Sequence, residues 1–254
     1  LYLLHNFFTI FMISVNGLAV EFGGTTLFSD ISFVINPQDR IALMGKNGAG
    51  KSTLLKILAG ERTPTRGNVS IPKDFVVAYL PQHLIMEGNC TVFEQVAKAF
   101  SQRNAMEARI NAINEELTQR TDYESDEYMK LIEEVSTLSE KFYGIEDTNI
   151  EEKIEKTLLG LGFIRDDFSR NVEEFSGGWR MRIELAKLLL QNPDVLLLDE
   201  PTTGVDVVSR KEFWQMLNRL KEQDISIFVS TPYMDEASLC DRIALIQEGK
   251  ILST

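Results

Sequence analysis

The sequence predicts an α/β protein with a mixed core sheet and flanking helices, an N-terminal antiparallel β subdomain, and a helical subdomain extended into a coiled-coil hairpin arm. Three observations support this prediction. A glycine-rich loop at residues 45–52 stands between an apolar strand and a helix, and a second apolar strand at 194–199 ends in two carboxylates. Two apolar stripes with helical spacing lie between residues 106 and 142. Strands alternating with helices are typical of α/β domains, and paired apolar stripes are typical of helical hairpins.

The composition is that of an ordinary globular protein. The chain has 254 residues, of which 44% are hydrophobic and 25% charged, which suits either one large domain or one domain with an inserted arm. The net charge of -12 argues against broad non-specific binding to nucleic acid, which depends on clustered Lys and Arg. No apolar run approaches the roughly 18 to 20 residues of a membrane-spanning helix. We therefore expect a cytoplasmic protein, with attachment to the inner face of the membrane as the alternative.

Residues 1–11 form a separate apolar stretch. They lack the positively charged region that begins a signal peptide, since the first basic residue of the chain is Arg40. Met12 is followed by a run typical of a strand. We interpret residues 1–11 as an extension before a single domain at 12–254, with an interfacial membrane anchor as the alternative.

Short β-rich runs separated by turns make up the first part of the domain. They lie at residues 13–20, 31–34, 40–43, 68–71 and 75–79. The third run continues directly into the glycine-rich loop, and the sequence after the loop, at 52–58, is predicted to be a helix. This order of strand, loop and helix is the context that a phosphate-binding loop requires.

The glycine-rich loop, Gly45-Lys-Asn-Gly-Ala-Gly-Lys-Ser52, fits the phosphate-binding pattern G-x-x-x-x-G-K-[ST] in full. Its glycines allow consecutive backbone N–H groups to face one anion, and the helix N-terminus adds partial positive charge. Lys51 can then reach the β- and γ-phosphates, and the Ser52 hydroxyl can bind Mg²⁺. A glycine-rich turn with a chance lysine is the alternative, and it should arise in only about one chain of this length in a hundred. The loop therefore predicts nucleotide binding.

Residues 92–161 are predicted to be almost entirely helical. Apolar residues recur at spacings of three and four in two stripes, Met106, Ile110, Ile113 and Leu117 in the first and Tyr128, Leu131, Val135, Leu138 and Phe142 in the second. A polar break at 119–126 separates the stripes, so they predict an antiparallel hairpin. Between residues 107 and 156, fifteen acidic and six basic residues give a net charge of -9. The arm therefore bears most of the negative charge, as a solvated helical face would.

A second glycine-rich motif, Phe175-Ser-Gly-Gly-Trp179, stands before an amphipathic run at 180–190. Ser176 can cap the N-terminus of the predicted helix, and the two glycines leave backbone amides open to an anion.

Two carboxylates end the apolar run at 194–199, whose aliphatic content is typical of a central parallel strand. Asp199 can hold Mg²⁺ through water, and Glu200 can polarise an attacking water. Two carboxylates at a strand end mean little alone, but here they follow a phosphate-binding loop. A third motif, Gly204-Val-Asp206, comes directly after Pro201-Thr-Thr.

With these motifs in this order, residues 13–254 resemble the ATP-binding cassette (ABC) ATPases. The resemblance implies that the ligands are ATP and Mg²⁺ and that a helical subdomain is inserted at about 92–190. It implies nucleotide binding by an aromatic residue stacked on adenine, a Q-loop glutamine and the Walker A loop, namely Phe22, Gln82, Gly45, Lys46, Asn47, Gly48, Ala49, Gly50, Lys51, Ser52 and Thr53. Taken alone, Phe22 would be a core aromatic at a strand end, and Gln82 an ordinary loop residue beside a proline.

The same resemblance implies roles for the other motifs. Glu200 is implied to be the catalytic carboxylate, and Mg²⁺ is implied to be held by Ser52, Gln82 and Asp199. Asp206 lies in the D-loop of the family. The signature motif, Ser176, Gly177 and Gly178, is implied to act on ATP held by a second cassette, either in a homodimer or from a lost tandem copy. This motif departs from the commonest form because Trp179 stands in place of Gln.

Two parts of the chain resemble two different subfamilies. Residues 13–202 resemble the ABC-F proteins, which act on ribosomes, because of the Phe-Gly-Gly near the start, the helical arm, and the run from Phe175 to Ala186. The ABC-F pattern then expects Asn-His-Leu-Asp, where this chain has Thr203-Gly-Val-Asp206. Residues 203–254 resemble the ATP-binding subunit of a multidrug exporter. This change of resemblance near Thr202 suggests a fusion.

A residue expected from the resemblance is missing. ABC ATPases usually place a histidine after the strand that follows Walker B, where it contacts the γ-phosphate. The histidines of this chain, His5 and His83, both lie upstream, and Pro232 stands at the matching position. Proline has neither a side-chain donor nor an N–H group. We expect ATP binding to be kept and ATP hydrolysis to be slow.

Three functions remain open from the sequence. The first is a translation-associated ATPase of ABC-F type with the ribosome as partner, and the second is the cytoplasmic ATPase subunit of an exporter with a membrane permease as partner. The arm favours the first, but its acidity weakens the case for contact with rRNA. The third is a chimaera that binds ATP and does nothing else.

Overall fold

The N-terminal part of the molecule is a small antiparallel sheet. The computed structural model describes residues 13–252 except 74, 85, 87, 124, 144–148 and 222, so the extension predicted at 1–11 lies outside the described residues. Strands β1 (Ile13–Phe22), β2 (Thr25–Ile35) and β4 (Arg66–Ser70) pair in the order β2-β1-β4. Gly23 and Gly24, both with positive φ, form the tight β1–β2 turn. The antiparallel subdomain predicted from the sequence is confirmed.

The core sheet has six strands in the order β5-β6-β7-β3-β8-β9. β3 (Arg40–Gly45), β5 (Val77–Leu80), β6 (Val195–Asp199), β7 (Ser226–Ser230) and β8 (Arg242–Gln247) run parallel, and β9 (Lys250–Ile251) is antiparallel to β8. Because the first five strands are parallel, their carboxyl ends meet at one edge. That edge collects the phosphate loop after β3, the Q-loop after β5 and the carboxylates at the end of β6. The predicted mixed core sheet is confirmed.

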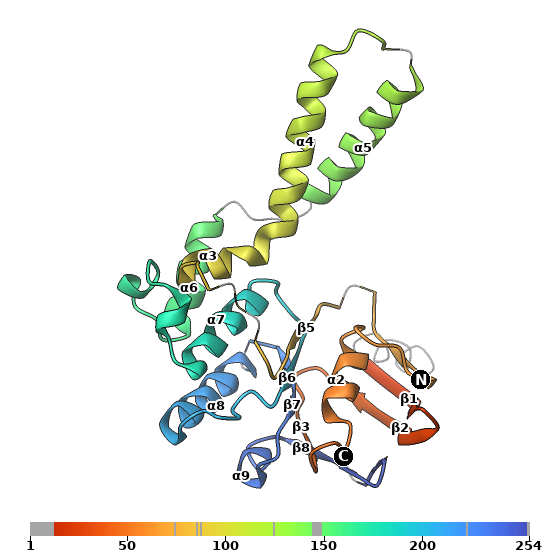
Figure 1. Ribbon diagram of the computed structural model, residues 1–254, viewed down its shortest axis with the longest axis vertical. Helices are drawn as coiled ribbons and strands as arrows, with labels where there is room; N and C mark the ends of the chain where they lie inside the picture. The colour runs from red at the N-terminus through yellow and green to blue at the C-terminus, as the bar shows by residue number, and fades with distance from the viewer. Residues whose placement is uncertain are drawn as a thin grey trace, which may run out of the picture.

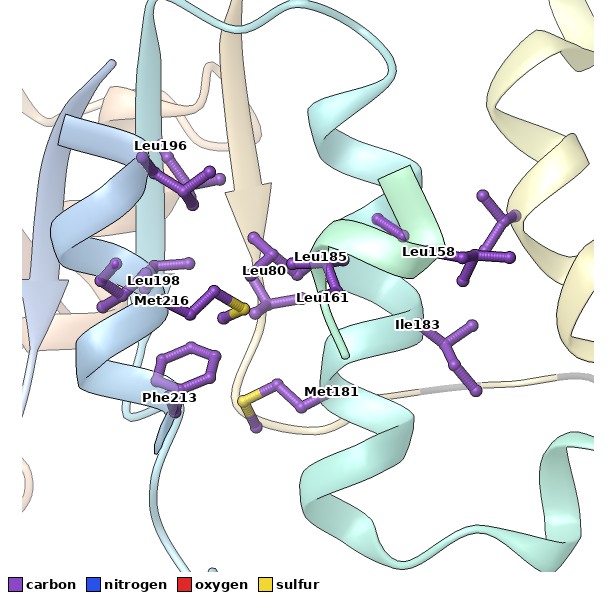
Figure 2. Close-up of a cluster of buried hydrophobic side chains, with 14 of the residues drawn as sticks. Leu80, Leu158, Leu161, Met181, Ile183, Leu185, Leu196, Leu198, Phe213 and Met216 are labelled. Atoms are coloured by element: carbon purple, nitrogen blue, oxygen red, sulfur yellow. The ribbon is translucent and has the colours of Figure 1, made fainter. Parts of the chain in front are cut away.

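Helices cover both faces of the core sheet. On one face, Val195 and Leu197 of β6 join the hydrophobic core formed with β1, β2, β3 and helix α2 (Lys51–Leu58). On the other, Leu196 and Leu198 pack with α6 (Ile150–Gly160), α7 (Gly177–Leu189) and α8 (Val207–Lys221). Figure 2 shows this second core, in which Phe213 and Met216 of α8 lie near β6. Successive side chains of β6 thus enter the two cores in turn, so both faces of the strand are buried. This burial explains why its sequence is uninterruptedly aliphatic.

The helical subdomain is inserted between β5 and β6. It begins with α3 (Val92–Ala97) and the short helix η2 (Lys98–Phe100), and ends with α6, the short helices η3 (Arg165–Asp167) and η4 (Val172–Glu174), and α7. A four-residue helix, α9 (Met234–Ala237), follows β7 in the core. α3 and α6 both pack on α7 within the buried core. The helix that bears the signature motif is therefore in contact with the base of the arm.

The arm itself consists of α4 (Ser101–Gln119) and α5 (Asp126–Tyr143), which project side by side from the rest of the molecule (Figure 1). The predicted stripes face each other, and Ile113 is fully buried between the two helices. A two-bond ion pair joins the helices, with Nε and Nη2 of Arg109 each 2.8 Å from a carboxylate oxygen of Glu134. The predicted antiparallel hairpin is confirmed.

Candidate functional site

The phosphate loop is held in shape by two glycines with close neighbours. A Cβ atom on Gly45 would lie 2.8 Å from the carbonyl oxygen of Ile246, and one on Gly50 would lie 2.9 Å from the ring of Phe28. Gly50 also has a φ of 100°, a left-handed conformation that side chains rarely adopt. The motif glycines are thus required by the backbone path at the end of β3.

The loop ends at the N-terminus of α2. Gly50 occupies the N-cap position of this helix and has no side chain to satisfy the first N–H groups. Free N–H groups in a helix's first turn, together with its positive end, form an anion-binding site. The predicted helix begins one residue earlier than expected, at Lys51.

A cavity of about 460 Å³ lies above this helix end. Its lining brings together nine of the residues proposed from the sequence, with Leu27 as an addition, namely Phe22, Leu27, Asn47, Gly48, Gly50, Lys51, Ser52, Thr53, Gln82 and Glu200. These residues come from β1, β2, the phosphate loop and the segments after β5 and β6. The cavity has the size of a typical small-molecule site. Gly45, Lys46, Ala49 and Asp199 do not line it.

Lys51 is held at the floor of the cavity, with 4% of its surface exposed. Its Nζ lies 3.0 Å from the carbonyl oxygen of Gly45 and 3.1 Å from Oε1 of Glu200. The amide of Gln82 donates to the other oxygen of Glu200 at 2.9 Å, and Thr203 donates to that oxygen at 3.4 Å. The lysine, the Q-loop glutamine and the proposed catalytic carboxylate therefore form one polar cluster.

Asp199, at the end of β6, accepts hydrogen bonds from two neighbouring strands. Ser230 of β7 donates to Oδ1 at 2.7 Å, and Tyr79 of β5 donates to Oδ2 at 3.3 Å. Burial, and then the negative charge of Asp199, raise the pKa of Tyr79, so its hydroxyl keeps the proton that it donates. Neither donor was among the residues predicted from the sequence. Their only signal is position, because Ser230 ends β7 and Tyr79 lies one residue before the end of β5, the two strands that flank β6.

The proposed Mg²⁺ ligands offer only oxygen atoms from a hydroxyl, an amide and a carboxylate, which suit a hard cation. Among the described residues, no group of three or more His, Cys, Asp or Glu side chains could hold a metal ion. Mg²⁺ commonly binds through one or two protein oxygens, with phosphate and water completing the shell. The donor set at Ser52, Gln82 and Asp199 fits that pattern.

Phe22 lies at the end of β1 with 43% of its surface exposed, so the alternative of a buried core aromatic is wrong. The guanidinium carbon of Arg62 lies 4.3 Å from the centre of the phenyl ring. A cation stacked on an aromatic ring is favourable by about 0.5–1 kcal/mol at an exposed site. The ring of Phe22 thus lines the phosphate-loop cavity with Arg62 stacked against it.

The signature motif does not line this cavity. Gly177 instead lines a separate cavity of about 360 Å³, together with Gln82, Thr203 and Gly204. Ser176 occupies the N-cap position of α7, but its side chain accepts no capping hydrogen bond, so the predicted side-chain cap is wrong. Ser176 and Gly177 are exposed, whereas Gly178 is half-buried beside Val205.

Asp206 of the D-loop acts as the N-terminal cap of α8. Its Oδ1 accepts from the backbone N–H groups of Ser209, at 3.0 Å, and Val208, at 3.1 Å. The bonds from Ser209, together with that from Val208, lower the pKa of Asp206. The cap fixes the point at which the chain leaves the D-loop.

The segment around Pro232 is anchored on both sides. The N–H of Thr231 donates to the carbonyl oxygen of Leu43, and the buried carboxylate of Glu236 accepts from the hydroxyls of Thr231 and Thr202. Pro232 itself is exposed. Position 232 is thus tied to β3, two residues before the phosphate loop, and to the segment that follows Glu200.

The comparisons with known proteins agree on one family. The ABC transporter family model matches residues 28–203. ABC transporter F family member 5 of Arabidopsis thaliana is 30% identical over 241 residues, which are 93% of this chain and 34% of that protein. A protein described as a probable multidrug ABC transporter ATP-binding protein, YbhF of Escherichia coli, is 30% identical over 253 residues, 96% of this chain and 37% of its own length.

The chain spans about a third of the length of these curated relatives. Among solved structures, the dimeric structure of a bacterial ABC transporter cassette superposes with a TM-score of 0.66 at 19% identity, covering 94% of this chain and 96% of that one. At this identity the likeness concerns the fold. No helix in the described part of the chain combines the length and the apolar character needed to cross a membrane.

Proposed function

Because the chain belongs to the ABC transporter family of ATP-binding cassettes, we propose that it binds MgATP at the phosphate-loop cavity, hydrolyses it slowly, and acts in translation as ABC-F proteins do. ATP binding is the property that the members of this family share. The observation that supports the site is the convergence of Phe22, the phosphate loop, Gln82 and Glu200 on one cavity. In this proposal Phe22 stacks on the adenine, while the loop amides from Gly45 to Thr53 and the Lys51 ammonium bind the phosphates.

The two carboxylates at the end of β6, Asp199 and Glu200, have different roles in the proposed reaction. Glu200 accepts a proton from the attacking water, whose oxygen forms a bond to the γ-phosphorus while the bond to the bridging oxygen breaks and ADP leaves with its electron pair. Ser52, Gln82 and, through water, Asp199 would hold Mg²⁺, which would supply positive charge that neutralises the phosphates. Lys51 exchanges its contact with Glu200 for the phosphates, which frees the carboxylate for water. With Pro232 in place of histidine, this reaction lacks one donor to the γ-phosphate.

A second cassette completes the site in this proposal, because Ser176, Gly177 and Gly178 lie outside the phosphate-loop cavity. Their hydroxyl and backbone amides would bind the phosphates held by a partner's loop. We expect a Glu200→Gln variant, which slows hydrolysis further, to sediment as a dimer in MgATP and as a monomer without it. Analytical ultracentrifugation under both conditions checks this. A monomer in both would show that the second cassette comes from elsewhere, or that none is needed.

The cellular role depends on the arm. The α4–α5 hairpin is long, which supports an ABC-F-like role with the ribosome as partner. Its acidity disfavours contact with rRNA, so in this role the arm contacts basic ribosomal proteins. The alternative is the ATP-binding subunit of an exporter, docked on a membrane permease. The relative described as a multidrug transporter protein supports it, because the alignment covers 96% of this chain and therefore includes most of residues 203–254. In both cases the cassette forms a single domain within residues 12–254, and a cytoplasmic location stays a prediction.

Co-sedimentation distinguishes the two roles. Glu200→Gln protein in MgATP is mixed with ribosomes in one experiment and with membrane vesicles from the same cells in another. We expect the protein in the ribosome pellet, and we expect Lys51→Ala, as the control for nucleotide dependence, to stay in the supernatant. Recovery with the vesicles would support the exporter role instead. Recovery in neither pellet, with ATP still bound, would leave a cassette that only binds nucleotide.

A further inference from the structure

Ser230 places one buried hydroxyl between the carboxylate of Asp199 and the backbone of Glu200, the two residues that the proposed chemistry uses. The residue ends β7, has no exposed surface, and pairs in register with Asp199 of β6. Its Oγ donates to Oδ1 of Asp199 at 2.7 Å and accepts the backbone N–H of Glu200 at 2.9 Å. A single atom therefore contacts both the proposed metal-binding carboxylate and the residue that bears the proposed catalytic one.

The backbone of Glu200 needs such support. Its φ is 45°, in the left-handed region that is uncommon for residues other than glycine. The N–H of Glu200 donates to the carbonyl oxygen of Ser230, at 3.1 Å, as well as to its hydroxyl oxygen. Unusual backbone conformations persist where the surrounding contacts determine them, and here both contacts come from Ser230. They direct the Glu200 side chain toward Lys51 and Gln82.

The hydroxyl proton of Ser230 has a single acceptor, the carboxylate of Asp199. A serine hydroxyl has one proton and two lone pairs, and the N–H of Glu200 occupies one of the lone pairs. The proton therefore points to Asp199. Since Tyr79 donates to the other oxygen of that carboxylate, both oxygens are held and the plane of the group is fixed. Each oxygen keeps a second lone pair for a water on the metal.

We propose that Ser230 is a positioning residue that sets the affinity for the divalent cation by orienting Asp199, and that also fixes the Glu200 backbone for its role with water. This inference rests on the proposed function, since it concerns the same site. Partners that orient a metal ligand typically change metal affinity or activity by about 10- to 100-fold when they are removed. Ser230 differs in role from a histidine at position 232, which would contact the γ-phosphate itself.

The test compares two serines at opposite ends of the same strand. Ser226 begins β7, is 3% exposed, and donates to the backbone oxygen of Asn36, far from the carboxylates. Ser230→Ala and the control Ser226→Ala thus remove the same atom from the same buried strand. Mn²⁺ replaces Mg²⁺ as the probe, and its affinity is measured by electron paramagnetic resonance with a non-hydrolysable ATP analogue bound. The affinity for the analogue is measured separately in EDTA.

We expect Ser230→Ala to weaken Mn²⁺ binding at least about tenfold, with the affinity for the analogue in EDTA unchanged and Ser226→Ala equal to wild type. If Ser230→Ala does not fold, Ser230→Cys retains the shape with a weak donor and should weaken Mn²⁺ binding in the same way. Unchanged Mn²⁺ affinity in a folded Ser230 variant, or an equal loss in Ser226→Ala, would overturn the inference. Failure of wild type to bind the analogue would instead refute the proposed function.

Discussion

Replacing Pro232 with histidine should increase the steady-state rate of phosphate release about 10²- to 10³-fold, the usual effect of one preorganised donor to a developing charge. The position is suitable because Thr231 is tied to β3 just before the phosphate loop and Ser230 contacts the carboxylate of Asp199 and the backbone N–H of Glu200. The affinity for ATP should stay nearly unchanged, since a contact made mainly in the transition state changes kcat rather than binding. Phosphate release and equilibrium binding of a fluorescent ATP analogue measure the two quantities.

Pro232→Ala is the matched control for this prediction. It removes the proline ring and restores a backbone N–H without adding a side-chain donor. We expect its turnover to stay near that of wild type. If Pro232→Ala raises the rate as much as Pro232→His, release of the loop is responsible and the donor is not. Fast hydrolysis by wild type, with no gain from the histidine, would show that this cassette does not need that residue.

Lys51→Ala should lower the affinity for ATP about 10- to 150-fold, because a hydrogen bond to a charged group is worth about 1.5–3 kcal/mol. The lysine is nearly buried at the floor of the cavity, and its ammonium already makes an ion pair with Glu200. Its loss also leaves that carboxylate uncompensated beside the phosphates. Titration with a fluorescent ATP analogue in the presence of Mg²⁺ measures the change.

Two further variants make this experiment specific. Lys56→Ala changes an exposed lysine in the last turn of the same helix, so its affinity should equal that of wild type. Glu200→Gln removes the carboxylate that pairs with Lys51. This variant should bind the analogue at least as tightly as wild type, because Lys51 no longer has to leave a carboxylate in order to contact the phosphates. Equal binding by Lys51→Ala and wild type would show that this loop is not the phosphate site.

Much of the site could be predicted because its chemistry lies in short local motifs. The phosphate loop and the carboxylates each follow an apolar strand, and parallel strands bring such ends to one edge. The arm was predictable for the same reason, since the spacing of residues such as Ile113 and Leu131 is a local signal. Local patterns of this kind need no knowledge of which strands are neighbours.

Contacts between strands far apart in sequence could not be predicted. The hydrogen bonds from Tyr79 and Ser230 to Asp199 depend on the order β5-β6-β7, which the sequence does not state. The ion pair between Lys51 and Glu200 depends on the same long-range arrangement. The side-chain cap expected at Ser176 failed for a different reason, because a residue type suited to a cap can occupy the position without making the bond.

The strand order also determines when the protein can fold during its synthesis. β1 and β2 are consecutive and can pair at once, whereas Arg40 of β3 pairs with Ile227 of β7, about 190 residues later. At about 5 to 20 residues per second, β3 waits about 10 to 40 s for that neighbour. During this interval β3 has both of its edges unpaired, while the local helices of the arm can already form. The growing chain therefore passes through a stage with an arm but without a core sheet, and that stage is the one most exposed to aggregation.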